Sequence, residues 1–131
     1  MKQVLMSIAI FSAAFFSLHL NAQDMNFGNE FRITKRTKLD YCKDAERGWR
    51  FETGKVTTEN NEPVLVVFFA ESKDGNWIKR NLRSDKNGEV KIGLEGCDLT
   101  GRYVYYAYYE GDKMYKHPSF EELLAVNGYM P

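Results

Sequence analysis

The residues of this chain that are best suited to chemistry are two cysteines and one histidine. Cys42 and Cys97 could serve as nucleophiles or as metal ligands. A cysteine nucleophile usually needs a histidine base, and only His117 follows the first 22 residues. A structural zinc site needs four nitrogen or sulfur ligands, and these three residues fall one short. The sequence therefore predicts no metal site, no cofactor and no cysteine-based catalysis.

Acidic residues gather beside the predicted turns, where a pair of carboxylates could hydrolyse a glycosidic bond. They are Asp74, Asp85, Glu95, Asp98, Glu110 and Asp112. Turns favour aspartate because its side chain hydrogen-bonds to the nearby backbone, so we interpret the set as solvated turn residues. The stretch Asp85-Lys86-Asn87-Gly88-Glu89 has the composition of a calcium loop, but its glycine stands fourth rather than sixth. We expect a hairpin turn there, and we predict no catalytic residue.

The most unusual stretch is a tyrosine-rich strand predicted over residues 102–110. Alternation places Tyr103, Tyr105, Ala107 and Tyr109 on one face, and Val104, Tyr106 and Tyr108 on the other. Because Val104 favours its own face as the core, Tyr103, Tyr105 and Tyr109 are predicted to face solvent. Exposed tyrosines would form a binding face for a sugar ring or an envelope protein. The alternative is that cross-strand aromatic pairs simply stabilise the sheet.

Residues 1–22 have the features of a signal peptide. Met1-Lys2-Gln3 is a short, positively charged start, an apolar stretch runs from Val4 to Leu20, and Leu20 and Ala22 occupy the small-residue positions of a cleavage site. Polar residues interrupt the apolar stretch, whereas a membrane-spanning helix needs about 20 apolar residues in a row. The alternative is an uncleaved N-terminal anchor. We expect an exported protein, in the periplasm, at the cell surface or outside the cell.

Cleavage would leave residues 23–131, which are 109 residues (131 minus 22) and the size of one domain. The whole chain balances 18 basic against 18 acidic residues, and this balance argues against nucleic acid as a partner. No later apolar run is long enough to span a membrane. In an oxidising compartment we expect a Cys42–Cys97 disulfide, worth about 4 kcal/mol. Buried free thiols are the alternative.

The elements that must position these residues are short strands separated by turn signals. About seven strands are predicted, over residues 27–34, 49–56, 64–71, 77–83, 89–94, 102–110 and 113–115. Ser119 and Glu122 form a capping box, which predicts a C-terminal helix at about residues 119–127. The pattern indicates an all-β fold, a small antiparallel β-sandwich in one domain, with a small closed barrel as the alternative.

One part of the chain resembles a known pattern. Gly54-Lys55-Val56, Glu62-Pro63-Val64, Ser84 to Ile92 and Gly101-Arg102-Tyr103 are similar to the transthyretin-like, carboxypeptidase-regulatory-like domains and to bacterial Ig-like domains. The resemblance covers about residues 54–104. It implies a β-sandwich that acts as a non-catalytic module for folding, spacing or binding. We therefore expect a binding or interaction module of the bacterial cell envelope, and the alternative is a small secreted hydrolase or an enzyme inhibitor.

Overall fold

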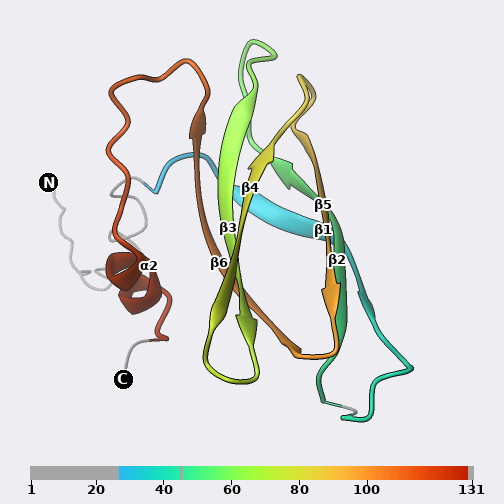
Figure 1. Ribbon diagram of the computed structural model, residues 1–131. Coiled ribbons are helices and arrows are strands. Elements are labelled where there is room, and N and C mark those ends of the chain that lie inside the picture. The colour runs from blue at the N-terminus through green and yellow to red at the C-terminus, as the bar shows by residue number, and fades with distance from the viewer. Residues whose placement is uncertain (1–26, 45, 130–131) are drawn as a thin grey trace, which may run out of the picture.

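The computed structural model describes residues 27–44 and 46–129, and the predicted signal peptide lies outside them. Its elements are β1 (Phe31–Lys38), β2 (Trp49–Val56), β3 (Val64–Ser72), β4 (Trp77–Arg83), β5 (Glu89–Gly96), β6 (Leu99–Tyr109) and α2 (Phe120–Val126). The strands form two three-stranded antiparallel sheets, with the orders β1-β2-β5 and β4-β3-β6. This confirms the predicted all-β sandwich with a short C-terminal helix (Figure 1).

The core lies between the two sheets. β3 is the central strand of its sheet, and its Val66, Phe68 and Ala70 are fully buried. Phe51 of β2 is also fully buried, and its ring meets that of Phe68 edge-on at 5.5 Å between centroids. Val90 alternates with exposed neighbours along β5, as a strand with one covered face should. The sequence therefore predicts the core correctly on these two strands, from the apolar run of residues 64–71 for β3 and from the alternation of residues 89–94 for β5.

A disulfide joins Cys42 to Cys97, as predicted. It links the β1–β2 connection to the turn between β5 and β6, across 55 residues of sequence. Gly48 makes this link possible, because a Cβ at that position would lie 2.7 Å from the Cys42 Sγ atom. The same glycine donates its backbone N–H to the Leu99 carbonyl. The bridge and the hydrogen bond thus hold the start of β6 to the loop beside β1.

The helix α2 covers the face of the β4-β3-β6 sheet that points away from the other sheet (Figure 1). The predicted capping box is present, since Ser119 accepts from the Glu122 N–H and Glu122 accepts from the Ser119 N–H. Leu123 of the helix packs on Val67 and Val104 in a second buried cluster. No helix within residues 27–44 and 46–129 is long and apolar enough to cross a bilayer.

Two predicted strands differ from the structure. The first strand spans residues 31–38 rather than 27–34, and the preceding segment forms only a single parallel bridge, from Gly28 to Ala107 of β6. Residues 113–115 form a turn rather than a seventh strand, because the Asp112 carboxylate accepts the Met114 N–H and turns the chain locally. The described sandwich therefore has six strands.

Candidate functional site

The predicted orientation of the tyrosines on β6 is wrong. Tyr103, Tyr105 and Tyr109 do not point away from the sandwich but pack, half-buried, against the core between the sheets. Val104 and Tyr106 are buried, as predicted, although their cover is α2 and not the second sheet. Both faces of β6 are covered. The second sheet packs on the inner face, and the helix α2 buries its apolar side on the outer face. Whether the three tyrosines bind a ligand stays a prediction.

The outer face of β6 carries an aromatic cluster. Tyr108 and Tyr115 stack with parallel rings at 4.6 Å, and Tyr106 lies parallel beside them. His117 meets all three rings edge-on, and its Nδ1 lies 3.0 Å from the Tyr106 hydroxyl. Burial, followed by the neighbouring tyrosines, raises the pKa of Tyr115 to about 12. These rings face one another, so the cluster fastens the segment after β6 onto the sheet.

The inner face of β6 packs against the core and borders hollows at Tyr105. The Tyr103 ring packs on Phe68 at 5.4 Å, and the Tyr105 ring meets Phe31 edge-on at 5.3 Å. The Tyr105 hydroxyl accepts the Phe31 N–H at 3.3 Å, and the Tyr109 hydroxyl accepts a backbone N–H from the β2–β3 connection. Burial raises the pKa of Tyr105, and the Glu30 carboxylate adds to this, while the Phe31 hydrogen bond lowers it. The phenol therefore stays neutral at ordinary pH and can still donate a hydrogen bond.

A groove of about 500 Å³ lies beside Tyr105, where the edge strands β1 and β6 approach each other. Its lining is Glu30, Phe31, Arg32, Lys55, Val56, Thr57, Thr58, Asn87 and Tyr105. Two smaller hollows, of about 120 and 320 Å³, continue along β6, and Tyr105 lines both of them as well. Tyr105 is therefore the residue that these three hollows share.

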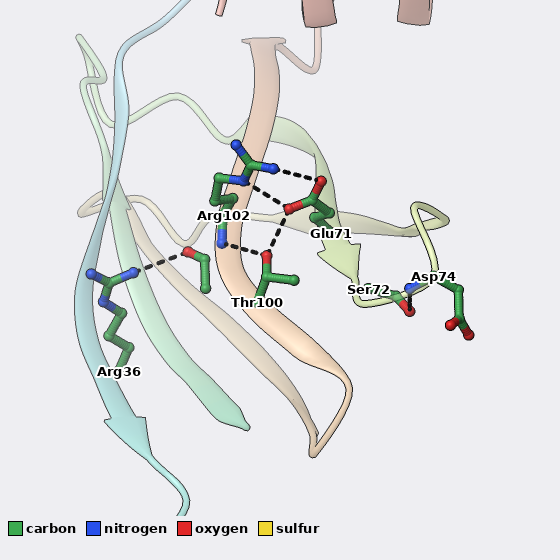
Figure 2. A network of polar contacts seen from close by, with 7 residues as sticks. Arg36, Glu71, Ser72, Asp74, Thr100 and Arg102 are labelled. Carbon is green, nitrogen blue, oxygen red and sulfur yellow. Dashed lines mark hydrogen bonds and ion pairs between the residues drawn. The ribbon is translucent and has the colours of Figure 1, made fainter. Parts of the chain in front are cut away.

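The other end of this edge is closed by Arg36. Figure 2 shows the Arg36 side chain reaching from β1 to β6, where it donates to the Gly101 carbonyl at 3.1 Å. The same guanidinium lies 4.7 Å from the Trp49 ring centre, a favourable cation–π distance. Gly101 allows this approach, because a Cβ there would meet the Trp49 ring at 2.8 Å. The gap between the edge strands β1 and β6 is thus bridged by Arg36 at Gly101, and it forms a groove at Tyr105.

A polar network fixes the start of β6 on its outer face (Figure 2). Glu71 accepts two hydrogen bonds from Arg102, at 2.8 and 3.0 Å, and one from the Thr100 hydroxyl. Burial raises the pKa of Glu71, but the bonds from Arg102 and Thr100 outweigh it and lower the pKa overall. Arg102 also lies over the Tyr129 ring at 4.7 Å. Both Glu71 oxygens are engaged within the chain, so we interpret the network as structural.

The groove brings together charged and neutral polar groups. Arg32 and Lys55 lie directly opposite each other on β1 and β2, and Lys55 lies opposite Glu89 on β5. The Lys55–Glu89 ion pair spans 3.6 Å and is solvent-exposed. The Arg32 side chain has no ion-pair or hydrogen-bond partner among the residues described, although its backbone lies in the ladder between β1 and β2. Sequence reasoning missed these residues because they become neighbours only through the strand register.

Five of the six acidic residues weighed as catalytic candidates are engaged in ion pairs or turn hydrogen bonds, Asp74 being the exception. Glu95 pairs with Arg50, Glu110 with Arg83, and Asp98 with Lys73. The Asp85 carboxylate accepts the N–H groups of Asn87 and Glu89, so the stretch with the composition of a calcium loop is a turn. It does not close a hairpin as predicted, because β4 and β5 belong to different sheets and the turn carries the chain from one sheet to the other. Within residues 27–44 and 46–129, no three metal-ligating side chains cluster.

Comparison with known protein families, with curated proteins and with solved structures finds no match.

Proposed function

We propose that this protein is an exported, non-catalytic binding module of the bacterial cell envelope, and that its ligand docks in the groove beside Tyr105. The observation that carries the proposal is that Tyr105 lines three adjoining hollows at the open edge of the sandwich. Their lining combines aromatic and apolar side chains, among them Phe31, Val56 and Tyr105, with charged and neutral polar ones. A concave apolar surface with a few polar groups is the usual form of a binding site.

Tyrosine suits this role because of its shape and its chemistry. Its ring is large and rigid, so little entropy is lost on contact, and its hydroxyl gives the contact a polar end. Tyr105 is already held by Phe31 through a ring contact and a hydrogen bond. A ring that is fixed before binding costs less to order than a mobile one. This supports Tyr105 as the anchor, with either a glycan or an envelope protein as the partner.

Export is supported by the disulfide. Disulfides persist in oxidising compartments and are rare in the cytosol, and Cys42–Cys97 has ordinary bridge geometry, with 5.5 Å between its Cα atoms. The predicted signal peptide supports the same compartment. Whether the protein acts in the periplasm or at the cell surface depends on where its partner lies.

The proposal is tested by comparing two tyrosines on opposite faces of one strand. Tyr105→Leu removes the ring and hydroxyl at the groove, and Tyr108→Leu is the matched control on the outer face. Binding to a glycan panel and to solubilised envelope is measured alongside thermal unfolding. We expect Tyr105→Leu to lose at least about tenfold in affinity, which is about 1.4 kcal/mol, while Tyr108→Leu binds as the unaltered protein does.

Two outcomes would contradict the proposal. Equal binding by both variants, with each still folded, would place the ligand elsewhere. Chemical turnover of a bound glycan would show a hydrolase, and the non-catalytic assignment would then be wrong. The triple variant with Tyr103, Tyr105 and Tyr109 changed to Ser extends the test to the whole inner face, but it should also lose stability because these rings contact the core.

A further inference from the structure

The charge arrangement at the groove indicates what kind of ligand it takes. Arg32 and Lys55 are directly opposite on neighbouring strands, and like charges in this arrangement destabilise a sheet. Both residues line the groove. An anion bound there would turn this unfavourable pair into a favourable site. Arrangements that cost stability are expected where function requires them.

The nearby carboxylates offset the two cations only in part. Glu89 contacts Lys55 at 3.6 Å, but both side chains are about half exposed, and exposed pairs of this kind are worth little. Glu30 is the only carboxylate that lines the groove. Arg32 keeps its guanidinium donors free of other residues in the described part of the chain. A guanidinium binds a carboxylate through two parallel hydrogen bonds, so Arg32 is the main candidate contact for an anion.

The neutral groups in the lining match the hydroxyls of a sugar. The side chains of Thr57 and Asn87 make no hydrogen bond to other described residues, and they offer both donors and acceptors. Glu30 supplies a further acceptor. Tyr105 supplies an aromatic ring for the apolar face of a sugar, and a groove of about 500 Å³ falls in the size range of small-ligand sites.

An extended acidic peptide fits this edge less well. Such a peptide would add to a free strand edge and exchange main-chain hydrogen bonds along it. The free edge of β6 is already occupied at Ala107, which bonds to Phe27 and Asn29, and at Gly101, which bonds to Arg36. Only a short stretch around Tyr105 remains for a further strand. The hydroxyl-rich and aromatic lining therefore favours a saccharide.

We infer that the groove binds an acidic saccharide, with a sugar ring on Tyr105 and its carboxylate held by Arg32 and Lys55. This inference rests on the proposed function, because it names the ligand class of the same groove. It predicts discrimination between sugars that differ only in charge. It also predicts that affinity falls as salt concentration rises, since the contacts are partly exposed.

The experiment is a calorimetric titration of the disulfide-bonded protein with oligomers of galacturonate, glucuronate and sialic acid. Neutral galactose oligomers and a polyglutamate peptide serve as comparison ligands. The variants are Arg32→Gln with Lys55→Gln, and Lys91→Gln as the control, because Lys91 is exposed on the same sheet and does not line the groove. Circular dichroism checks that each variant folds.

We expect at least one acidic oligomer to bind about tenfold or more tightly than its neutral counterpart. The double variant should lose about 10- to 100-fold, as expected for charge-assisted hydrogen bonds, and Lys91→Gln should lose less than about twofold. If neutral oligomers bind equally well and Tyr105→Leu abolishes that binding, the proposed function stands and this inference fails. Tighter binding of polyglutamate would assign the groove to acidic peptides. Binding of no acidic oligomer, or an equal loss in Lys91→Gln, would also overturn the inference.

Discussion

The two faces of β6 carry the same kind of residue but differ in what covers them. On the outer face, the rings of Tyr106 and Tyr108 contact those of Tyr115 and His117, in the same cluster as Leu123 of the helix. On the inner face, Tyr105 is packed on one side by Phe31 and lines hollows on the other. The outer tyrosines contact one another and the segment after β6, whereas Tyr105 borders the hollows in which we propose that a ligand binds. A run of tyrosines therefore indicates a candidate site only where a ring borders a hollow of the folded chain.

The largest expected effect concerns the disulfide that joins the β1–β2 connection to the turn before β6. Replacing Cys42 and Cys97 by Ser should lower the free energy of unfolding by about 4 kcal/mol, because a loop of 55 residues is no longer closed. Chemical denaturation measures this loss. Intact mass before and after reduction and alkylation checks the bridge itself. Two thiols that alkylate without reductant would contradict the pairing.

The next largest effect tests whether the packing of α2 on the outer face of β6 influences binding in the groove. Leu123 is 1% exposed and anchors α2 on Val67 and Val104. Leu123→Ala should lower the free energy of unfolding by about 3 kcal/mol. Leu123 lines the smallest of the three hollows but not the groove of about 500 Å³, so the affinity of that groove should stay unchanged. Denaturation and ligand titration are measured on the same sample. A loss of affinity in protein that is still folded would show that the two faces are coupled.

A smaller effect tests the helix that closes the outer face. Ser119 accepts the Glu122 N–H as the N-cap of α2, and Ser119→Ala should cost about 1 kcal/mol through the loss of that bond. The sandwich should still fold, since its core lies between the sheets. A control, Ser119→Asp, keeps an N-cap acceptor and should recover most of the loss. Equal stability of all three proteins would mean that the cap contributes nothing.

The smallest effect should appear only at high pH. The pKa of Tyr115 is raised by burial from 10.0 to about 12, so its contribution to stability is complete below pH 10. It is lost as pH rises from 10 to about 12, because the unfolded chain then binds fewer protons than the folded one. Denaturation across this range should show a decline that is smaller in Tyr115→Phe. An identical decline in both proteins would contradict the raised pKa.

Much of the fold follows from local patterns in the sequence. The alternation of Val90, Ile92 and Leu94 predicts β5 and its buried face, and the capping box at Ser119 predicts the helix. The sequence predicts the first strand too early in the chain, because residues 35–38 are mostly charged and are not assigned to a strand. β1 is an edge strand, which tolerates lysine and arginine better than a central strand does. The turn at Met114 depends on one side-chain hydrogen bond, which local propensity does not reveal.

The candidate site was only half predictable. Tyr105 stands out in the sequence as part of a tyrosine run. Its orientation depends on which face of β6 the helix α2 covers, and tertiary packing decides this. Arg32 and Lys55 lie 23 positions apart (55 minus 32), and only the register of β1 and β2 makes them opposite neighbours. The groove arises where two edge strands from different sheets meet, and no local pattern encodes that meeting.

The most direct test of this account is a nuclear magnetic resonance titration of the mature protein with envelope glycans, followed at the aromatic and backbone signals of both faces. We expect shifts at Tyr105, Phe31 and Thr57, where the groove lies, and none at Tyr108 or Tyr115. Shifts confined to Tyr108 and Tyr115 would place binding on the outer face and contradict the account. Saturating glycan with no shift at Tyr105 would contradict it equally.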